Sequence, residues 1–158
     1  MEQNRTTPTG KRRTSKREEP EVASAEAARE EGLDERMLTA LRAAADKKAY
    51  DLVALDLRAV ASFTDFFLIC SASNVRQAQA VADEVLERLK KQGERAYRVE
   101  GYNTAEWVLL DYGDFILHVF EEKARRFYDL ERLWRDAARV RLPEDAAGGG
   151  EGSLRNER

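Results

Sequence analysis

The apolar run at residues 66–72 constrains the fold of this chain more than any other segment. It reads Phe-Phe-Leu-Ile-Cys-Ser-Ala, without a charged residue and without alternation of apolar and polar positions. A continuous run of this kind is typical of a strand that a sheet buries on both faces. Residues 52–57 predict a neighbouring strand, so the core is expected to form around a sheet.

Helical periodicity appears on both sides of these two strands. Residues 33–48 carry apolar side chains at helical spacing, with Asp34 near the start as a cap or first-turn acid. A second helix is predicted to begin after Ser73 or Asn74, which are both capping residues, and to end at Gly93.

The second half of the chain predicts a hairpin and a last helix. Residues 95–100 resemble a short half-exposed strand, and residues 107–110 and 115–120 predict two strands joined by a turn at 111–114. A helix is predicted over 124–139. Its apolar stripe consists of Phe127, Leu130, Leu133, Trp134, Ala137 and Ala138. The order α-β-β-α-β-β-β-α implies the α/β class, with a mixed β-sheet of about five strands flanked by helices.

Charge is unevenly distributed along the chain. Residues 100–122 contain six carboxylates and no Lys or Arg, whereas residues 123–141 contain seven basic and three acidic residues. Residues 33–142 carry 18 basic and 19 acidic residues, so their net charge implies no nucleic-acid partner. Because the acidic hairpin repels phosphate, the protein is expected to show no strong direct nucleic-acid binding. The arginines of the predicted last helix are interpreted mainly as its solvent face, with a secondary contact to RNA as the alternative.

The length of 158 residues suits one domain with a substantial core. Residues 1–32 have almost no large apolar side chains and predict a disordered charged tail. Residues 33–142 are predicted to form the domain, and residues 143–158, with three consecutive glycines, a flexible C-terminal tail. No apolar run approaches the roughly 20 residues that span a bilayer, and no signal peptide is recognised, so a cytoplasmic location is expected.

No complete catalytic or metal-binding constellation occurs in the sequence. His118 is the one histidine and Cys70 the one cysteine, which is too few for a structural zinc site or a hydrolytic triad. Asp111 and Asp114 are the best pair for magnesium, but acids at turn positions usually accept hydrogen bonds from backbone N–H groups. No glycine-rich phosphate loop is present. The sequence therefore predicts no catalytic residue, no metal and no cofactor.

Alternate residues of the first hairpin strand point to opposite sides of the sheet. One set is Trp107, Leu109 and Asp111, and the other is Val108, Leu110 and Tyr112. Only one set can face the core. If helices cover only that side, the other set exposes apolar side chains beside carboxylates, which is the composition of a docking site for a basic partner. If both sides are covered, Trp107 is a core residue, and the pattern leaves these alternatives open.

Several short motifs follow one another between Leu33 and Leu142. They are Thr64-Asp-Phe-Phe67, Ser73-Asn74, Glu100-Gly101, Trp107-Val-Leu-Leu-Asp-Tyr-Gly-Asp114, His118-Val-Phe120 and Phe127-Tyr-Asp-Leu-Glu-Arg-Leu-Trp134. In order and spacing, this set resembles the ribosomal silencing factor family, also called RsfS or Iojap-like. The runs at 107–114 and 127–134 are together specific to that family.

The resemblance implies a non-enzymatic translational repressor. Such a protein binds the large ribosomal subunit through the ribosomal protein numbered fourteen and blocks joining of the small subunit when nutrients are scarce. Matched by motif, the partner-binding residues are Trp107, Val108, Leu109, Leu110, Asp111 and Tyr112, with Glu100 and Asp114 as acidic complements to a basic protein. Members of the family often form homodimers, so a homodimer is also expected.

The fold of the family resembles that of nucleotidyltransferases, and this supplies the alternative function. An enzyme of that kind would hold nucleotide and metal with a Gly-Ser loop and a D-x-D pair. Ser73-Asn74 opens the second predicted helix without the glycine, and no D-x-D occurs in the chain. A nucleotidyltransferase-like activity would therefore require an unrecognised nucleotide site, and likeness of fold does not by itself establish function.

Overall fold

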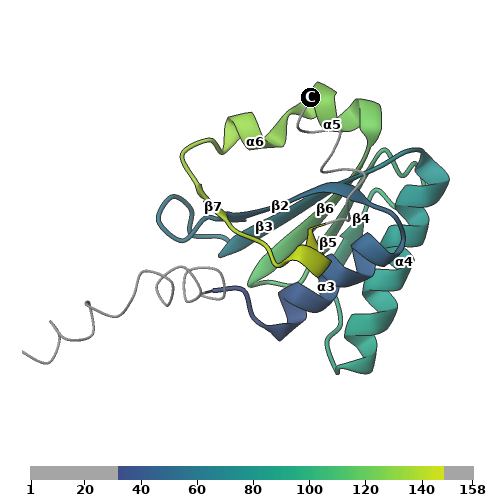
Figure 1. Ribbon diagram of the computed structural model, residues 1–158, viewed down its shortest axis with the longest axis horizontal. Helices are drawn as coiled ribbons and strands as arrows, with labels where there is room; N and C mark the ends of the chain where they lie inside the picture. The colour runs from purple at the N-terminus through teal and green to yellow at the C-terminus, as the bar shows by residue number, and fades with distance from the viewer. Residues whose placement is uncertain (1–31, 148–158) are drawn as a thin grey trace, which may run out of the picture. The chain divides into compact units, whose positions relative to one another are not determined.

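Strand β3 (Phe66–Ala72) lies inside the sheet with all seven of its residues buried, which confirms the prediction from its apolar run. The computed structural model describes residues 32–147, and their sheet has six strands (Figure 1). The other strands are β2 (Tyr50–Asp56), β4 (Arg98–Glu100), β5 (Trp107–Asp111), β6 (Phe115–Glu121) and β7 (Ala138–Val140). Their order across the sheet is β4-β5-β6-β3-β2-β7.

Strand pairing makes this sheet mixed, as predicted. The central strands β3 and β6 run parallel, with Ile69 opposite His118. All other neighbouring strands pair antiparallel, including the predicted hairpin of β5 and β6. Parallel strands need a long crossover, and helix α4 with strands β4 and β5 supplies it between β3 and β6.

Helices α3 (Glu35–Asp46) and α4 (Val75–Lys91) cover one face of the sheet (Figure 1). Both begin at predicted capping residues: Asp34 accepts a hydrogen bond from the Met37 N–H at 3.1 Å, and Asn74 accepts one from the Gln77 N–H at 2.8 Å. The apolar sides of the two helices pack on alternate residues of the strands and form the larger core cluster. These helices therefore decide which side of each strand is buried most deeply.

The opposite face is covered by two shorter helices, α5 (Glu122–Tyr128) and α6 (Leu130–Leu133) (Figure 1). Of their residues, only Ala124 and Leu130 are buried. These two side chains join a second, smaller core cluster that includes Phe67 and Phe120. Because α5 and α6 are short, this face of the sheet keeps part of its surface open to solvent.

The prediction of a single helix over 124–139 is wrong. Asp129 takes φ 50° and ψ 53°, a left-handed conformation that ends α5 before α6 begins. Asp adopts this conformation more readily than most residues because its short polar side chain can bond locally. Residues 138–140 then pair with β2 as strand β7, which brings the strand count of the described residues to six instead of about five. The sequence does contain an apolar stripe at helical spacing, but the break at Asp129 turns its side chains in different directions.

The described chain continues beyond residue 142, where the sequence predicts that the domain ends. Residues Glu144–Ala146 form a short 3-10 helix, η1, whose Ala146 is buried in the larger core cluster. Asp145 forms an ion pair with Arg42 of α3 at 3.0 Å. The rest of the predicted C-terminal tail, residues 148–158, and residues 1–31 of the predicted N-terminal tail lie outside the described residues.

Candidate protein-docking face

Strand β5 separates the predicted partner-binding residues into two rows. Trp107, Leu109 and Asp111 are half-buried and lie on the side of α5 and α6; this set is called the β5 row below. Of the two predicted sides of β5, the side that carries the β5 row is therefore the one that solvent reaches.

The other row of β5 is part of the core. Val108, Leu110 and Tyr112 are buried among the residues that α3 and α4 cover. The Tyr112 ring stacks on Phe115 at a centroid distance of 5.0 Å, and burial raises the pKa of its hydroxyl to about 12. The side chains of these three residues are closed to a partner, although all three carry the family motif.

Trp107 is the centre of the β5 row. Its indole Nε1–H donates a hydrogen bond to His118 Nδ1 at 3.0 Å. Its ring packs on Phe120 at 4.9 Å and on Tyr128 of α5 at 4.8 Å between centroids. A tryptophan with one buried side and one open side, held by a hydrogen bond, is typical of an interface anchor.

His118 lies directly beneath this tryptophan and is only 3% exposed. Burial lowers the pKa of its imidazole to about 3, so the ring is neutral near pH 7. Because Nδ1 accepts the indole proton, the imidazole carries its own proton on Nε2. The Phe67 ring packs edge-on against the imidazole at 4.4 Å. Packed among aromatic rings and hydrogen-bonded to the indole, this histidine supports the position of Trp107.

Further exposed apolar side chains lie on the same face as the β5 row. Phe127 is 79% exposed, Leu133 74%, Phe63 58% and Tyr128 47%. Phe63 contacts the Trp134 ring at 5.9 Å and the Phe67 ring at 6.0 Å. Sequence reasoning missed Phe63, which stands in a loop without periodicity. Exposed apolar side chains gathered on one face indicate an interaction surface.

The predicted acidic residues already have basic partners within the chain. Arg98 of β4 forms ion pairs with Asp111 at 3.1 Å and Glu100 at 3.3 Å. Arg36 of α3 forms one with Asp114 at 2.8 Å. Asp111 also accepts a hydrogen bond from the Gly113 N–H at 2.8 Å, which is the turn role expected of an acid at this position. These carboxylates are therefore less available to a basic partner than the sequence suggests.

Glu106 was not singled out by sequence reasoning, yet it lies next to Trp107 and is exposed. Within residues 32–147, no basic group forms an ion pair with it. By contrast, Glu121 caps α5 through the Ala124 N–H, and Glu122 pairs with Arg126 at 3.5 Å. Of the six carboxylates in residues 100–122, Glu106 is thus the one without an ion pair or a capping role in the described residues.

In the described part of the chain, no three His, Cys, Asp or Glu side chains gather closely enough to hold a metal ion. None of the helices at 32–147 is long and apolar enough to cross a bilayer.

Fold and surface together define a mixed α/β domain with a half-open aromatic face on one side of its sheet. The family described as "Ribosomal silencing factor during starvation" matches residues 30–157. The chain therefore belongs to the ribosomal silencing factor family, which agrees with the motifs read from the sequence.

Known relatives are similar over about two thirds or more of the chain. The ribosomal silencing factor RsfS of Halalkalibacterium halodurans is 45% identical over 103 residues, which cover 65% of this chain and 88% of that protein. Protein Iojap of maize chloroplasts is 32% identical over 66% of this chain and 45% of its own length. A crystal structure of a protein from Chromobacterium violaceum is 30% identical with a TM-score of 0.63, over 77% of this chain and 98% of that one.

Proposed function

We propose that this chain represses translation under nutrient limitation by binding the large ribosomal subunit in the cytoplasm. The proposed contact is the ribosomal protein numbered fourteen, and the bound domain blocks joining of the small subunit by occupying that surface. Membership of a ribosomal silencing family supports the ribosome as target. The observation that carries the proposal is the half-exposed β5 row, with Trp107 at its centre and exposed aromatic side chains beside it.

Docking in this proposal depends mainly on apolar contact. Trp107 and Leu109 supply the anchors, since their outer surfaces are open and their inner surfaces are packed. Glu106 supplies an acidic group without an internal partner in the described residues, which suits a basic ribosomal protein. Asp111, Asp114 and Glu100 act chiefly inside the domain, where their ion pairs hold the hairpin.

A single charge placed in the β5 row tests this proposal. Leu109→Arg introduces a guanidinium against a basic partner and removes an apolar anchor, so affinity for isolated large subunits should fall at least about tenfold. Co-sedimentation of the purified chain with separated subunits measures it. Thermal unfolding of the variant checks that the domain is still folded.

Val99→Arg is the matched control. Val99 is 41% exposed on the neighbouring strand β4, but it pairs with Leu110 and so faces the other side of the sheet. Its substitution adds the same charge at the same edge and should leave subunit binding unchanged. Equal binding by both variants and the native chain would refute docking through the β5 row. The expected homodimer stays a prediction, which sedimentation equilibrium of the same samples measures.

A further inference from the structure

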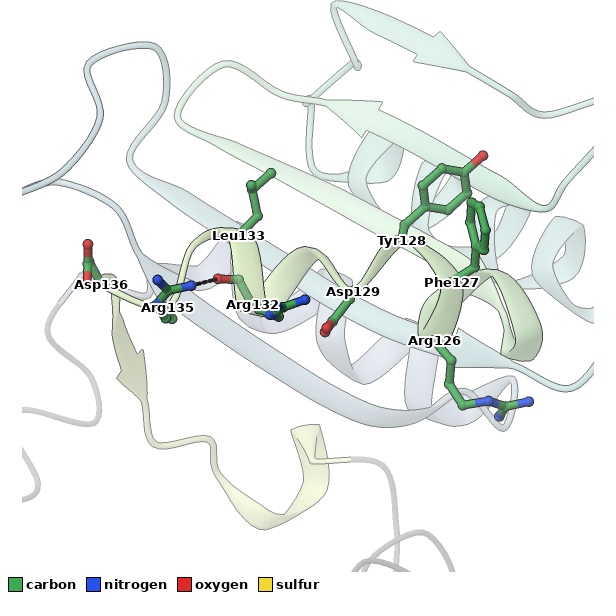
Figure 2. A pocket seen from close by; sticks show the side chains of 8 residues that line it. All are labelled: Arg126, Phe127, Tyr128, Asp129, Arg132, Leu133, Arg135 and Asp136. Carbon is green, nitrogen blue, oxygen red and sulfur yellow. Dashed lines mark hydrogen bonds between the residues drawn. The ribbon is translucent and has the colours of Figure 1, made fainter.

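A shallow groove of about 630 Å³ lies along α5 and α6, outside the β5 row (Figure 2). Its lining combines three arginines with exposed apolar side chains: Arg126, Arg132, Arg135, Phe127, Tyr128 and Leu133. Figure 2 shows Phe127, Tyr128 and Leu133 extending to one side of the α5–α6 ribbon and Arg126 to the other. The Phe127 and Tyr128 rings meet edge-to-face at 5.0 Å. This set is called the α5–α6 groove below.

The guanidinium groups of the groove are largely unused by the domain. Arg132 and Arg135 form no ion pair with any carboxylate in residues 32–147, and Arg126 reaches Glu122 only at 3.5 Å. Arg125, on the same helix, differs sharply, because it forms a close ion pair with Glu131 at 2.7 Å and is mostly buried. Arg125 therefore joins the two helices. The Arg135 guanidinium donates a hydrogen bond to the Arg132 backbone carbonyl oxygen at 3.3 Å, and in the described residues no carboxylate lies closer than 3.5 Å to any of the three groove guanidinium groups.

Two aspartates, Asp129 and Asp136, also line the groove, so it carries three basic groups and two acidic ones. Arginine side chains are long and carry their charge far from the backbone, whereas an aspartate keeps its charge close to it. Outside the groove lining, the surrounding segment 123–141 has four further basic residues and one further acidic residue.

Exposed aromatic rings and arginines that line one groove are a combination that binds unpaired RNA. Bases stack on the rings or on guanidinium planes, and phosphates bind the guanidinium groups. Neither the core nor the β5 row uses the outer surface of Phe127, which is 79% exposed. A protein partner with acidic side chains would be attracted by the arginines, but it would not explain the solvent-facing ring as well.

We infer that the α5–α6 groove binds an unpaired segment of ribosomal RNA, with the phosphates on Arg126, Arg132 and Arg135 and a base on Phe127. This inference rests on the proposed function. Tyr128 links the two surfaces, because its ring packs on Trp107 at 4.8 Å. A domain that docks through the β5 row therefore brings the groove against the subunit beside it. The protein contact and the RNA contact are then adjacent but chemically separate.

Photocrosslinking identifies what occupies the groove. A benzophenone amino acid at position 127, in the full chain bound to isolated large subunits, should give a crosslinked product that ribonuclease digests. The same group at position 75 is the control, since Val75 is 43% exposed at the start of α4, on the other face of the sheet. A product with a ribosomal protein or with a second copy of this chain would overturn the inference. Subunit binding without any product at position 127 would do the same.

Charge substitution supplies an independent readout. The triple variant Arg126→Ala, Arg132→Ala and Arg135→Ala should bind large subunits at least about tenfold more weakly. The negative slope of log affinity against log salt concentration should become shallower by about 2. The control triple, Arg76→Ala, Lys90→Ala and Arg95→Ala, removes the same charge from exposed residues of α4 and the following loop. Equal losses in both triples would overturn the inference.

The two proposals fail in distinguishable ways. Loss of binding in Leu109→Arg with no effect of the groove substitutions leaves the proposed function in place and rejects the RNA contact. If the native chain does not co-sediment with large subunits at all, the proposed function fails and the inference falls with it.

Discussion

Trp107 connects the solvent-facing surface of β5 to the interior of the domain. Its position depends on His118, which accepts the indole N–H at 3.0 Å. It depends also on Gly101, whose φ of 77° and close approach to the Trp107 carbonyl oxygen leave no room for a Cβ atom. Because a hydrogen bond and ring packing already fix the Trp107 side chain, it loses little conformational entropy when a partner binds, which favours affinity.

His118 makes stability depend on pH in a predictable direction. Its pKa is lowered to about 3 in the folded chain, from near 6.5 in an unfolded one. Between these values the unfolded state binds a proton that the folded state does not, so the free energy of unfolding falls as pH falls. The decrease is up to about 1.4 kcal/mol per pH unit below pH 6.5. Phe67, Trp107 and Phe120, the rings packed around His118, carry no charge that would oppose it.

Urea unfolding at several pH values between about 7 and 5 measures this slope. His118→Leu introduces an apolar side chain of similar size that does not titrate. The free energy of unfolding of this variant should therefore depend less on pH than that of the native chain. Identical slopes for the two proteins would show that the imidazole titrates normally and is not buried as described.

At the scale of elements, Asp129 decides the shape of the surface. The segment from 124 to 139 has helical periodicity, but the left-handed backbone at Asp129 divides it into α5 and α6. The break leaves Leu130 buried while Phe127 and Leu133 are exposed. A continuous helix would have placed these three side chains on a single stripe. The α5–α6 groove exists because this stripe is interrupted.

Substitution at Asp129 distinguishes a broken helix from a continuous one. A β-branched residue is costly in the left-handed region, so Asp129→Val should lower the free energy of unfolding by about 1–2 kcal/mol. Asp129→Gly should change the free energy of unfolding by less than about 0.5 kcal/mol. Glycine adopts the left-handed conformation without steric cost, and this gain offsets the larger conformational entropy that glycine loses on folding. In a continuous helix the order would reverse, with glycine the more damaging. Urea unfolding of the two variants decides between them.

At the scale of the whole described domain, distant segments complete the core. Strand β7 pairs with β2, and η1 adds Ala146 to the core beside α3. Arg36 of α3 reaches Asp114 in the turn between β5 and β6, across 78 positions of sequence. None of these contacts can be predicted from the local sequence patterns of the segments that they join.

Truncation measures the contribution of the last described residues. A chain that ends at residue 142 lacks the buried Ala146 and the Arg42–Asp145 ion pair, whereas a chain that ends at 147 keeps both. The shorter chain should be less stable by about 1 kcal/mol, most of it from the lost apolar burial. Equal midpoints in thermal unfolding would place the domain boundary at 142, as the sequence predicts.

Local pattern was sufficient for much of this domain. The uncharged run at 66–72, the capping residues Asp34 and Asn74, and the hairpin turn at 111–114 each act through their immediate neighbours, so the sequence alone predicted β3, both long helices and the β5–β6 pair. The family motifs are likewise a property of order and spacing. Periodicity failed at Asp129 because a single backbone conformation is not visible in the apolar pattern.

The tertiary structure alone decided which side of β5 is open and which acids are free. The alternating pattern of a strand does not show which of its two rows faces the core, since that depends on which side the helices cover. Here α3 and α4 cover Val108, Leu110 and Tyr112. Carboxylates at 100–122 look available in the sequence, yet Arg98 and Arg36 neutralise several of them through the fold. The sequence by itself determined the family and the strand that carries the motif, and three-dimensional packing determined the face that strand presents.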